Sequence, residues 1–392
     1  MLVTRIIGKC PECKRENSFG NVNIHQNWLL RGCTHCKYSI EIPLPELSKK
    51  IIYLDQFFLS HAFRAKLKQF VDATDIISGL AQNQLVVCPH SPFHKTETLQ
   101  WRHDKKEQLL DFIKRASHGH KFYPEYKIKI TQITNSFQRY LENDEKEFSV
   151  NLRDALPVEI NLWDDYFWID VNGVPEDTEE IRKSKEDAVD QLVELFRNWR
   201  TQKTTFEQDQ RHELISGANA YLQLYMEMTQ RFANGDVAAI LDSPIYTKIV
   251  EYLLHFNKDE MDINNRLKRI VQFFNSAYYY ETPCEFISTG LFAALKQKVK
   301  NGHYTNAEKA KEKLSGIFND INIISTYAPY CDAMFIDNQM FDFIKVPELN
   351  LEAKFNTIFF ARKTWDEFMD YLIKIKGQKN KEIDWALRLV HG

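Results

Sequence analysis

Two C-x-x-C pairs near the amino terminus constrain this sequence more than any other feature. Cys10 and Cys13 form the first pair, Cys33 and Cys36 form the second, and residues 14–32 separate the two. Four thiolates at this spacing can surround one ion, and Zn²⁺ favours such tetrahedral sulfur sites. Strand-like patterns flank the pairs at residues 5–7, 28–31 and 38–42. Residues 1–45 are therefore predicted to form a zinc ribbon that holds a structural Zn²⁺ ion.

Other uses of these cysteines fit the pattern less well. A redox dithiol needs only one C-x-x-C pair, and paired disulfides require an oxidising compartment. The ribbon could dock nucleic acid or a protein partner, or only fold a module whose own core is too small. Cys88, Cys284 and Cys331 occupy apolar segments and are expected to be buried and to bind no metal. His90 and His94, which lie near Cys88, are expected to be structural rather than a second metal site.

The 392 residues correspond to two or three domains, and with 44% hydrophobic residues they can bury a sizeable core. The net charge of −3 argues against a protein that binds nucleic acid by being basic throughout. No apolar run approaches the roughly 18 to 20 residues that a spanning helix needs, and the amino terminus lacks the apolar stretch of a secretory signal. We expect a soluble, cytoplasmic protein with no membrane partner, and oligomers are possible.

Four short apolar runs have the pattern of buried strands in a parallel sheet, at residues 49–55, 85–88, 333–337 and 356–360. Helical spacing follows at residues 57–80, 319–326 and 364–376. The long middle segment is mostly helical, apart from strands or a hairpin expected within 163–173. We therefore predict an α/β domain with a parallel sheet, built from residues 49–100 and 316–392 and interrupted by a helical insertion at 101–315.

Four acidic residues follow this strand pattern. Asp55 and Asp337 end strands, Asp332 lies just before the second of these strands, and Glu97 lies on a helix after residues 85–88. The carboxyl ends of parallel strands open onto the ligand crevice, where converging carboxylates repel one another unless a cation compensates. Oxygen ligands suit Mg²⁺ or Mn²⁺, which can activate a water for phosphodiester cleavage. The alternative is that these residues are helix caps and surface acids.

Three segments that carry these acids, at 51–56, at 86–97 and at 329–338, resemble the PIN-domain nuclease superfamily. That family has an Asp at the end of the first strand, an acid early on a helix after the second, an Asp on a later helix and an Asp at the end of the next strand. The resemblance implies a three-layer α/β/α fold and a Mg²⁺- or Mn²⁺-dependent endonuclease that hydrolyses RNA, or less often DNA. Its catalytic and metal-binding residues would be Asp55, Glu97, Asp332 and Asp337. Accessory-rich nucleases of this type resemble toxin or anti-phage defence effectors.

The sequence departs from the family pattern in two ways. Phe57 stands where many prokaryotic members have an Asn, so the positioning role of that Asn is absent or has moved, for example to Ser60 or Asn338. The interval between Glu97 and Asp332 is also far longer than a compact member needs. A catalytically degenerate PIN-like module that binds nucleic acid or a protein partner therefore stays open, as does a nuclease that acts on DNA.

Charge is unevenly distributed along the insertion. Residues 102–129 and 296–313 each carry a net charge of +4, and both stretches lie close in sequence to the predicted acids. They could hold a phosphate backbone, although solvated helix faces would have the same composition. The candidate nucleic-acid-binding residues are Arg102, Lys105, Lys106, Lys296, Lys298 and Lys300. Residues 141–180 carry a net charge of −11, and our hypothesis is that they cover this basic rim or exclude substrate until a partner moves them.

Overall fold

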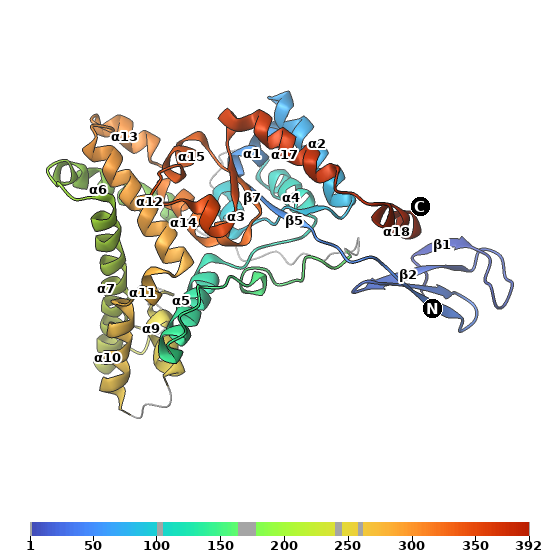
Figure 1. Cartoon of the computed structure of the whole chain (residues 1–392), viewed down its shortest axis with the longest axis horizontal. Coiled ribbons are helices and arrows are strands. Elements are labelled where there is room, and N and C mark those ends of the chain that lie inside the picture. Colours follow the sequence, from blue (N-terminus) through green and yellow to red (C-terminus); the bar gives the residue numbers. More distant parts are fainter. Residues whose placement is uncertain (1, 100–104, 164–177, 240–244, 258–261, 392) are drawn as a thin grey trace.

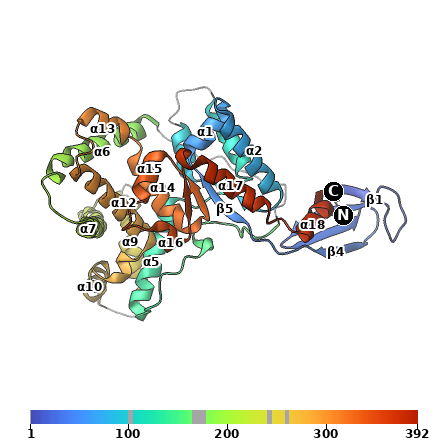
Figure 2. The same ribbon diagram turned by 45° about the horizontal axis from the view of Figure 1, so that its top comes forward.

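The computed structural model describes residues 2–99, 105–163, 178–239, 245–257 and 262–391. Figures 1 and 2 show three parts in a row, with the ribbon at one end, an α/β body in the middle and a block of long helices at the other end. Of the features expected from the sequence, Arg102 and the segment 164–173 lie outside the described residues.

The ribbon is an antiparallel sheet with strand order β1-β2-β3-β4. Three of its strands were predicted and β2 was not. Cys10, Phe19 and Cys33 form its small buried cluster, against which Tyr38 and Ile40 pack. The strands are β1 (Arg5–Gly8), β2 (Phe19–His25), β3 (Trp28–Cys33) and β4 (Ser39–Pro43).

The body contains the predicted parallel sheet, with strand order β6-β5-β7-β8, so the chain is mixed α/β. Alternate residues of β5 belong to two different cores: Ile51 and Tyr53 to one, Ile52 and Leu54 to the other. Helices therefore cover both faces, and this explains why the strands are apolar throughout rather than alternating. The strands are β5 (Lys50–Leu54), β6 (Val86–Val87), β7 (Ala333–Phe335) and β8 (Ile358–Phe360).

One core holds the helices that follow β5 and β8. The predicted helix at 57–80 is two helices, because the chain turns at Ala65, whose φ of +50° ends the first. The helices at 319–326 and 364–376 are confirmed. The helices next to the sheet are α1 (Gln56–Arg64), α2 (Lys68–Gln82), α3 (Pro92–Leu99), α4 (Lys106–Ala116), α14 (Ile317–Tyr327), α15 (Asn338–Ile344), α16 (Leu351–Phe355) and α17 (Trp365–Lys376), whereas α18 (Lys381–His391) lies beside the ribbon (Figure 1). Short 3₁₀ turns, η1 (Leu152–Asp154), η2 (Ala328–Tyr330) and η3 (Arg362–Thr364), complete the connections.

The insertion is helical, as predicted. Its helix α12 packs between α7 and α14, and Ile287 and Leu291 of α12 share a core with the sheet residue Met334. A second core at the far end contains the buried aromatic residues Phe273, Phe274 and Tyr279. The insertion helices are α5 (Glu125–Glu142), α6 (Thr178–Trp199), α7 (Phe206–Ala233), α9 (Thr247–Phe256), α10 (Ile263–Phe274), α11 (Ala277–Tyr280), α12 (Pro283–Lys300) and α13 (Ala307–Lys313).

In the described part of the chain, no helix is both long enough and apolar enough to cross a membrane.

The ribbon is bound to the last helix, α18. Arg31 donates from Nη2 to the Leu389 carbonyl over 2.9 Å, and Asn21 donates from Nδ2 to the Val390 carbonyl over 3.1 Å. Arg5 also donates to the Val390 carbonyl, over 3.2 Å. Carbonyl groups in the last turn of a helix have no partner within the helix and carry partial negative charge. The ribbon therefore caps α18, beside which it lies in both views (Figures 1 and 2).

Candidate metal centre and candidate active site

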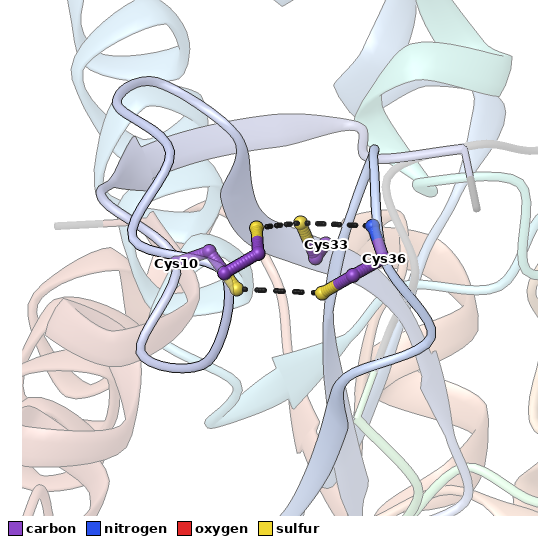
Figure 3. Close-up of side chains that lie close together, drawn as sticks. Cys10, Cys33 and Cys36 are labelled. Atoms are coloured by element: carbon purple, nitrogen blue, oxygen red, sulfur yellow. Dashed lines mark hydrogen bonds between the residues drawn. The ribbon is translucent and has the colours of Figure 1, made fainter.

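The four ribbon cysteines come together as the sequence predicts, with their sulfur atoms all within 4.8 Å of one another. The Cys10 and Cys36 sulfurs are 3.7 Å apart, and those of Cys13 and Cys33 are 3.8 Å apart. Zn–S bonds of about 2.3 Å in a tetrahedron give sulfur separations of about 3.8 Å, whereas a disulfide needs about 2.05 Å. Figure 3 shows Cys10 facing Cys33 and Cys36 across the end of the ribbon. The geometry fits a structural metal such as Zn²⁺.

The hydrogen bonds around Cys33 favour a thiolate. Its sulfur accepts from the backbone N–H groups of His35, over 3.3 Å, and of Cys36, over 3.5 Å. Burial raises the pKa of Cys33, but these N–H groups and Ser18 outweigh it and lower that pKa to about 5. Metal ligation requires the thiolate form of cysteine, and the hydrogen bonds from His35, Cys36 and Ser18 favour that form at Cys33. The other cysteines, Cys88, Cys284 and Cys331, are buried and unpaired, as expected.

The second site lies where the strand order of the parallel sheet changes direction. The chain proceeds from β5 outward to β6 on one side, and from β7 outward to β8 on the other. The crevice beyond the carboxyl ends of the two central strands is where open α/β sheets bind ligands. Asp55 follows β5 directly and Asp337 follows β7 after one residue. Both line one small cavity at this edge of the sheet, as expected from the sequence.

Asp55 is the first residue of the cluster and caps α1. Its Oδ1 accepts from the Gln56 backbone N–H over 2.6 Å. Burial, followed by the negative charges of Glu97 and Asp337, raises the pKa of Asp55 well above its usual value. The adjacent Gln56 side chain is buried, and its Oε1 accepts no hydrogen bond from the described residues. Buried carboxylates whose negative charges act on one another fit a divalent cation, which would compensate them.

Glu97 lies on α3 and is close enough to Asp55 for its charge to act there. Its Oε1 accepts from Asn319 Nδ2 over 3.1 Å, a bond that orients the carboxylate from α14. The helix α3 is itself positioned by His94, whose Nε2 bonds to the Leu54 carbonyl over 2.8 Å. Ser91 N–H donates to His94 Nδ1 over 2.9 Å, and burial lowers the His94 pKa to about 4. His94 is therefore structural, as expected, and connects the helix of Glu97 to the strand of Asp55.

Asp337 caps α15 and accepts from the Met340 backbone N–H over 2.7 Å. Burial raises its pKa, and the charge of Asp342 raises it further, against the opposing hydrogen bonds from Met340 and Gln339. A carboxylate that caps a helix keeps a fixed orientation. Asp337 therefore presents its second oxygen in a constant position at the sheet edge.

Asp332, the fourth predicted acid, lies at the amino ends of the central strands, opposite the carboxyl ends where Asp55 and Asp337 lie. It precedes β7, and its Oδ2 accepts from the Ile51 backbone N–H over 2.8 Å. Its Oδ1 forms an ion pair with Lys50 at 2.7 Å. Strand β7 separates Asp332 from Asp337, so the expectation that all four acids converge is wrong for Asp332.

A different acid, Asp320, lines the cavity together with Asp55 and Asp337. It lies in the first turn of α14, the helix that precedes β7, and Asn319 beside it holds Glu97. The sequence signal was present, because a helix is predicted at 319–326 and Asp320 lies on it. Among the described residues, the cysteine cluster is the one group of three or more potential ligands within 4.8 Å of one another, so the carboxylates are more widely spaced than that.

Two of the predicted nucleic-acid-binding lysines are internal to the helical block. Lys296 is buried and forms an ion pair with Glu213 at 2.6 Å. Lys300 forms an ion pair with the fully buried Asp209 and donates to the Thr204 carbonyl over 3.1 Å. The prediction is wrong for both, because their charges are already neutralised inside the protein. Lys298 lies on another face of α12, and Lys105 and Lys106 lie at the start of α4, partly or fully exposed.

The end of the described part of the acidic segment contacts the chain between the ribbon and β5. Trp163 donates from Nε1 to the Pro45 carbonyl over 2.8 Å, and Asn161 Oδ1 accepts from the Lys49 backbone N–H over 2.9 Å. This part of the segment therefore lies against the connection between the ribbon and β5, near the amino edge of the sheet.

Phe57, which departs from the family pattern, packs against Phe335 and Phe70 at ring distances of 5.8 and 6.2 Å. Phe57 is partly buried against the core. It supplies no polar group to the acidic edge, which is the place at the carboxyl ends of β5 and β7 where Asp55 and Asp337 lie. Asn338, one expected substitute, accepts from the Lys363 backbone N–H over 3.1 Å.

Compared with models of known protein families, with curated proteins and with solved structures, the chain has no match in any of the three.

Proposed function

We propose that this protein is a divalent-metal-dependent endonuclease with a PIN-like α/β/α domain, and that its substrate is RNA. The observation that carries the proposal is the position of Asp55 and Asp337 at the carboxyl ends of the two central strands, where the strand order changes direction. Glu97 of α3 and Asp320 of α14 add two further carboxylates, from two helices that are joined by the Asn319–Glu97 hydrogen bond.

The chain's own residues would hold the cation and orient its ligands. Asp55 and Asp337 are fixed by their backbone N–H bonds, and Glu97 is fixed by Asn319. A bound Mg²⁺ or Mn²⁺ ion would lower the pKa of a coordinated water and stabilise the charge on the leaving oxygen. Asp320 would take the role that the resemblance to PIN-domain nucleases assigned to Asp332, since an acid on the helix before β7 fits the pattern of that family.

The decisive experiment is incubation of the purified protein with labelled single-stranded RNA, transfer RNA and single-stranded DNA, in Mn²⁺ or in EDTA. We expect cleavage of RNA in Mn²⁺, no cleavage in EDTA, and a loss of about a hundredfold or more in Asp55→Asn and in Asp337→Asn. Asp366→Asn, an exposed acid on α17, is the matched control and should cleave normally. Cleavage that persists in EDTA or in both variants would refute the mechanism.

A binding module without catalysis is the second candidate, and Phe57 favours it because an apolar ring replaces a polar group beside Asp55. RNA binding without cleavage in any metal would support this candidate. Cleavage of DNA alone would change the substrate and leave the acid assignment intact.

A further inference from the structure

A turn of the insertion, His303–Tyr304, follows helix α12, which packs against α15, the helix that Asp337 caps. Tyr304 is half-buried, and its backbone φ of +58° is unusual for a residue with a side chain. Burial raises the pKa of Tyr304, and the charges of Asp342 and Asp337 raise it further. The hydroxyl group is therefore within electrostatic reach of one of the proposed catalytic acids, although it comes from a different part of the chain.

The turn is held by α6. Arg200 follows this helix and donates from Nη2 to the Tyr304 carbonyl over 2.7 Å. The Phe196 and Tyr304 rings pack with their centroids 6.0 Å apart. A strained backbone persists only where its surroundings fix it, and this one is fixed by both contacts. These contacts with Arg200 and Phe196 hold the Tyr304 turn in a fixed position against α6.

Two ammonium groups lie against aromatic rings of α15, the helix that Asp337 caps. Lys298 of α12 lies 4.4 Å over the Phe343 ring, and Lys363 lies 4.7 Å over the Phe341 ring. Lys363 forms an ion pair with Asp342, whereas Lys298 forms none with a described residue. Burial lowers the pKa of Lys298, and the Lys363 charge lowers it further, against the opposing effect of Asp342. The Asp342 carboxylate therefore acts on both ammonium groups, but its ion pair is with Lys363.

An anion would complete this arrangement. A half-buried ammonium group without a counter-ion gains from a phosphate oxygen, which restores its charge balance. The acidic edge alone would repel a polyanion, so a substrate needs positive groups next to it. The hydroxyl group of a tyrosine can also donate to a phosphate.

We propose that Lys298, Lys363 and Tyr304 form a binding site for the phosphodiester backbone of the nucleic acid, next to the acidic edge. The proposal rests on the proposed function and assigns the insertion a role in it: helix α12 and the turn after it hold the substrate strand against the cleavage site. Lys296 and Lys300, which flank Lys298 in the sequence, take no part, because their own ion pairs are internal.

The test measures binding separately from cleavage. In the Asp55→Asn background, the affinity for fluorescein-labelled single-stranded RNA is determined by anisotropy at several salt concentrations, for Lys298→Gln, Lys363→Gln and Tyr304→Phe. We expect Lys298→Gln to weaken binding about tenfold and to reduce the salt dependence by about one ion, and Lys298→Arg to restore both. Tyr304→Phe should weaken binding by about threefold to tenfold, the contribution of one hydrogen bond.

Lys374→Gln, an exposed lysine in the last turn of α17, is the matched control and should bind normally. Unchanged affinity in Lys298→Gln and in Tyr304→Phe, with thermal unfolding like that of the parent, would overturn this site and leave the nuclease proposal untouched. An equal loss of RNA affinity in Lys374→Gln would also overturn it, since the loss would then come from the lower net charge of the protein and not from a specific contact. If the wild type cleaves nothing and yet its RNA binding depends on Lys298, the site holds and the nuclease proposal fails.

Discussion

Lys50 donates from Nζ to Asp332 Oδ1 over 2.7 Å, at the amino ends of strands β5 and β7. This ion pair takes Asp332 out of the acidic edge and gives it a structural role. Both side chains are partly exposed, so the pair contributes no more than about 1 kcal/mol to the free energy of unfolding.

The first prediction distinguishes Asp332 from Asp320. Asp332→Asn should leave RNA cleavage within about threefold of wild type, because the residue is remote from the cavity. Asp320→Asn should reduce cleavage by about a hundredfold or more, because it removes a carboxylate that lines the cavity. Initial rates in Mn²⁺, with folding checked by circular dichroism, measure both. The reverse ranking would restore Asp332 to the site.

A second prediction concerns pH and the stability of the metal-free protein. The pKa of Asp55 is higher in the folded protein than in the unfolded chain, because of burial, Glu97 and Asp337. Its contribution to stability is therefore full at low pH, below the unfolded-state pKa, and is lost as pH rises through the folded-state pKa. A divalent cation compensates the ionised carboxylates, so Mn²⁺ should raise the melting temperature more at pH 8 than at pH 5.5.

Asp55→Asn gives the matching result in the same assay. Without metal it should unfold at a higher temperature than wild type at pH 8, because the neutral amide removes the cost of burying a charged carboxylate beside Glu97 and Asp337. It should also lose most of the Mn²⁺-dependent increase. Asp366→Asn should behave like wild type in both respects, and an identical Mn²⁺ response in Asp55→Asn would contradict cation binding at this edge.

The third prediction is for the cysteine cluster. The protein should contain one zinc ion per chain, measured by atomic absorption, and Cys13→Ser should lose it. Cys88→Ala, which changes a buried cysteine outside the cluster, should retain the metal. Removal of zinc by a chelator should unfold the ribbon, because its own core contains few residues. A ribbon that keeps its amide protection without metal would argue against a structural role.

A fourth prediction follows from the buried ion pair of Lys300 and Asp209. Lys300→Met should lower the free energy of unfolding by about 3 to 5 kcal/mol, because it leaves Asp209 charged and buried. Urea denaturation measures this change. Lys298→Met, two positions away and without an ion pair among the described residues, is the control and should cost much less. Equal costs would mean that the Lys300 pair contributes little.

Much of this fold follows from local sequence patterns. The cysteine spacing identifies the ribbon, because four cysteines that could hold one ion must come together in space. Apolar runs at 49–55 and 333–337 identify central strands, because a sheet covered on both faces needs side chains that are apolar on both. Strand β2 was missed because its sequence, Phe19–His25, is half polar in a module that is mostly surface.

Two errors in the predicted site, at Asp332 and at the lysines of α12, follow from the regular geometry of strands and helices. An acid before a strand and an acid after it cannot meet, since five residues of extended chain span roughly 16 Å, and this separates Asp332 from Asp337. Likewise, residues two apart on a helix face in different directions while residues four apart share a face. Lys296 and Lys300 therefore turn inward together, and Lys298 does not. The partners that decide which face is buried, such as Asp209, come from distant helices and could not be read locally.

The capping of α18 by the ribbon has a mechanical consequence. Force applied between residues 5 and 390 would load the hydrogen bonds of Arg5, Asn21 and Arg31 to the last helix before it reached the parallel sheet. These hydrogen bonds join the ribbon to α18, and they persist only while the ribbon stays folded. If the ribbon unfolds when it lacks a metal, α18 would therefore lose these hydrogen bonds and separate from the ribbon, while the α/β body between them stays folded.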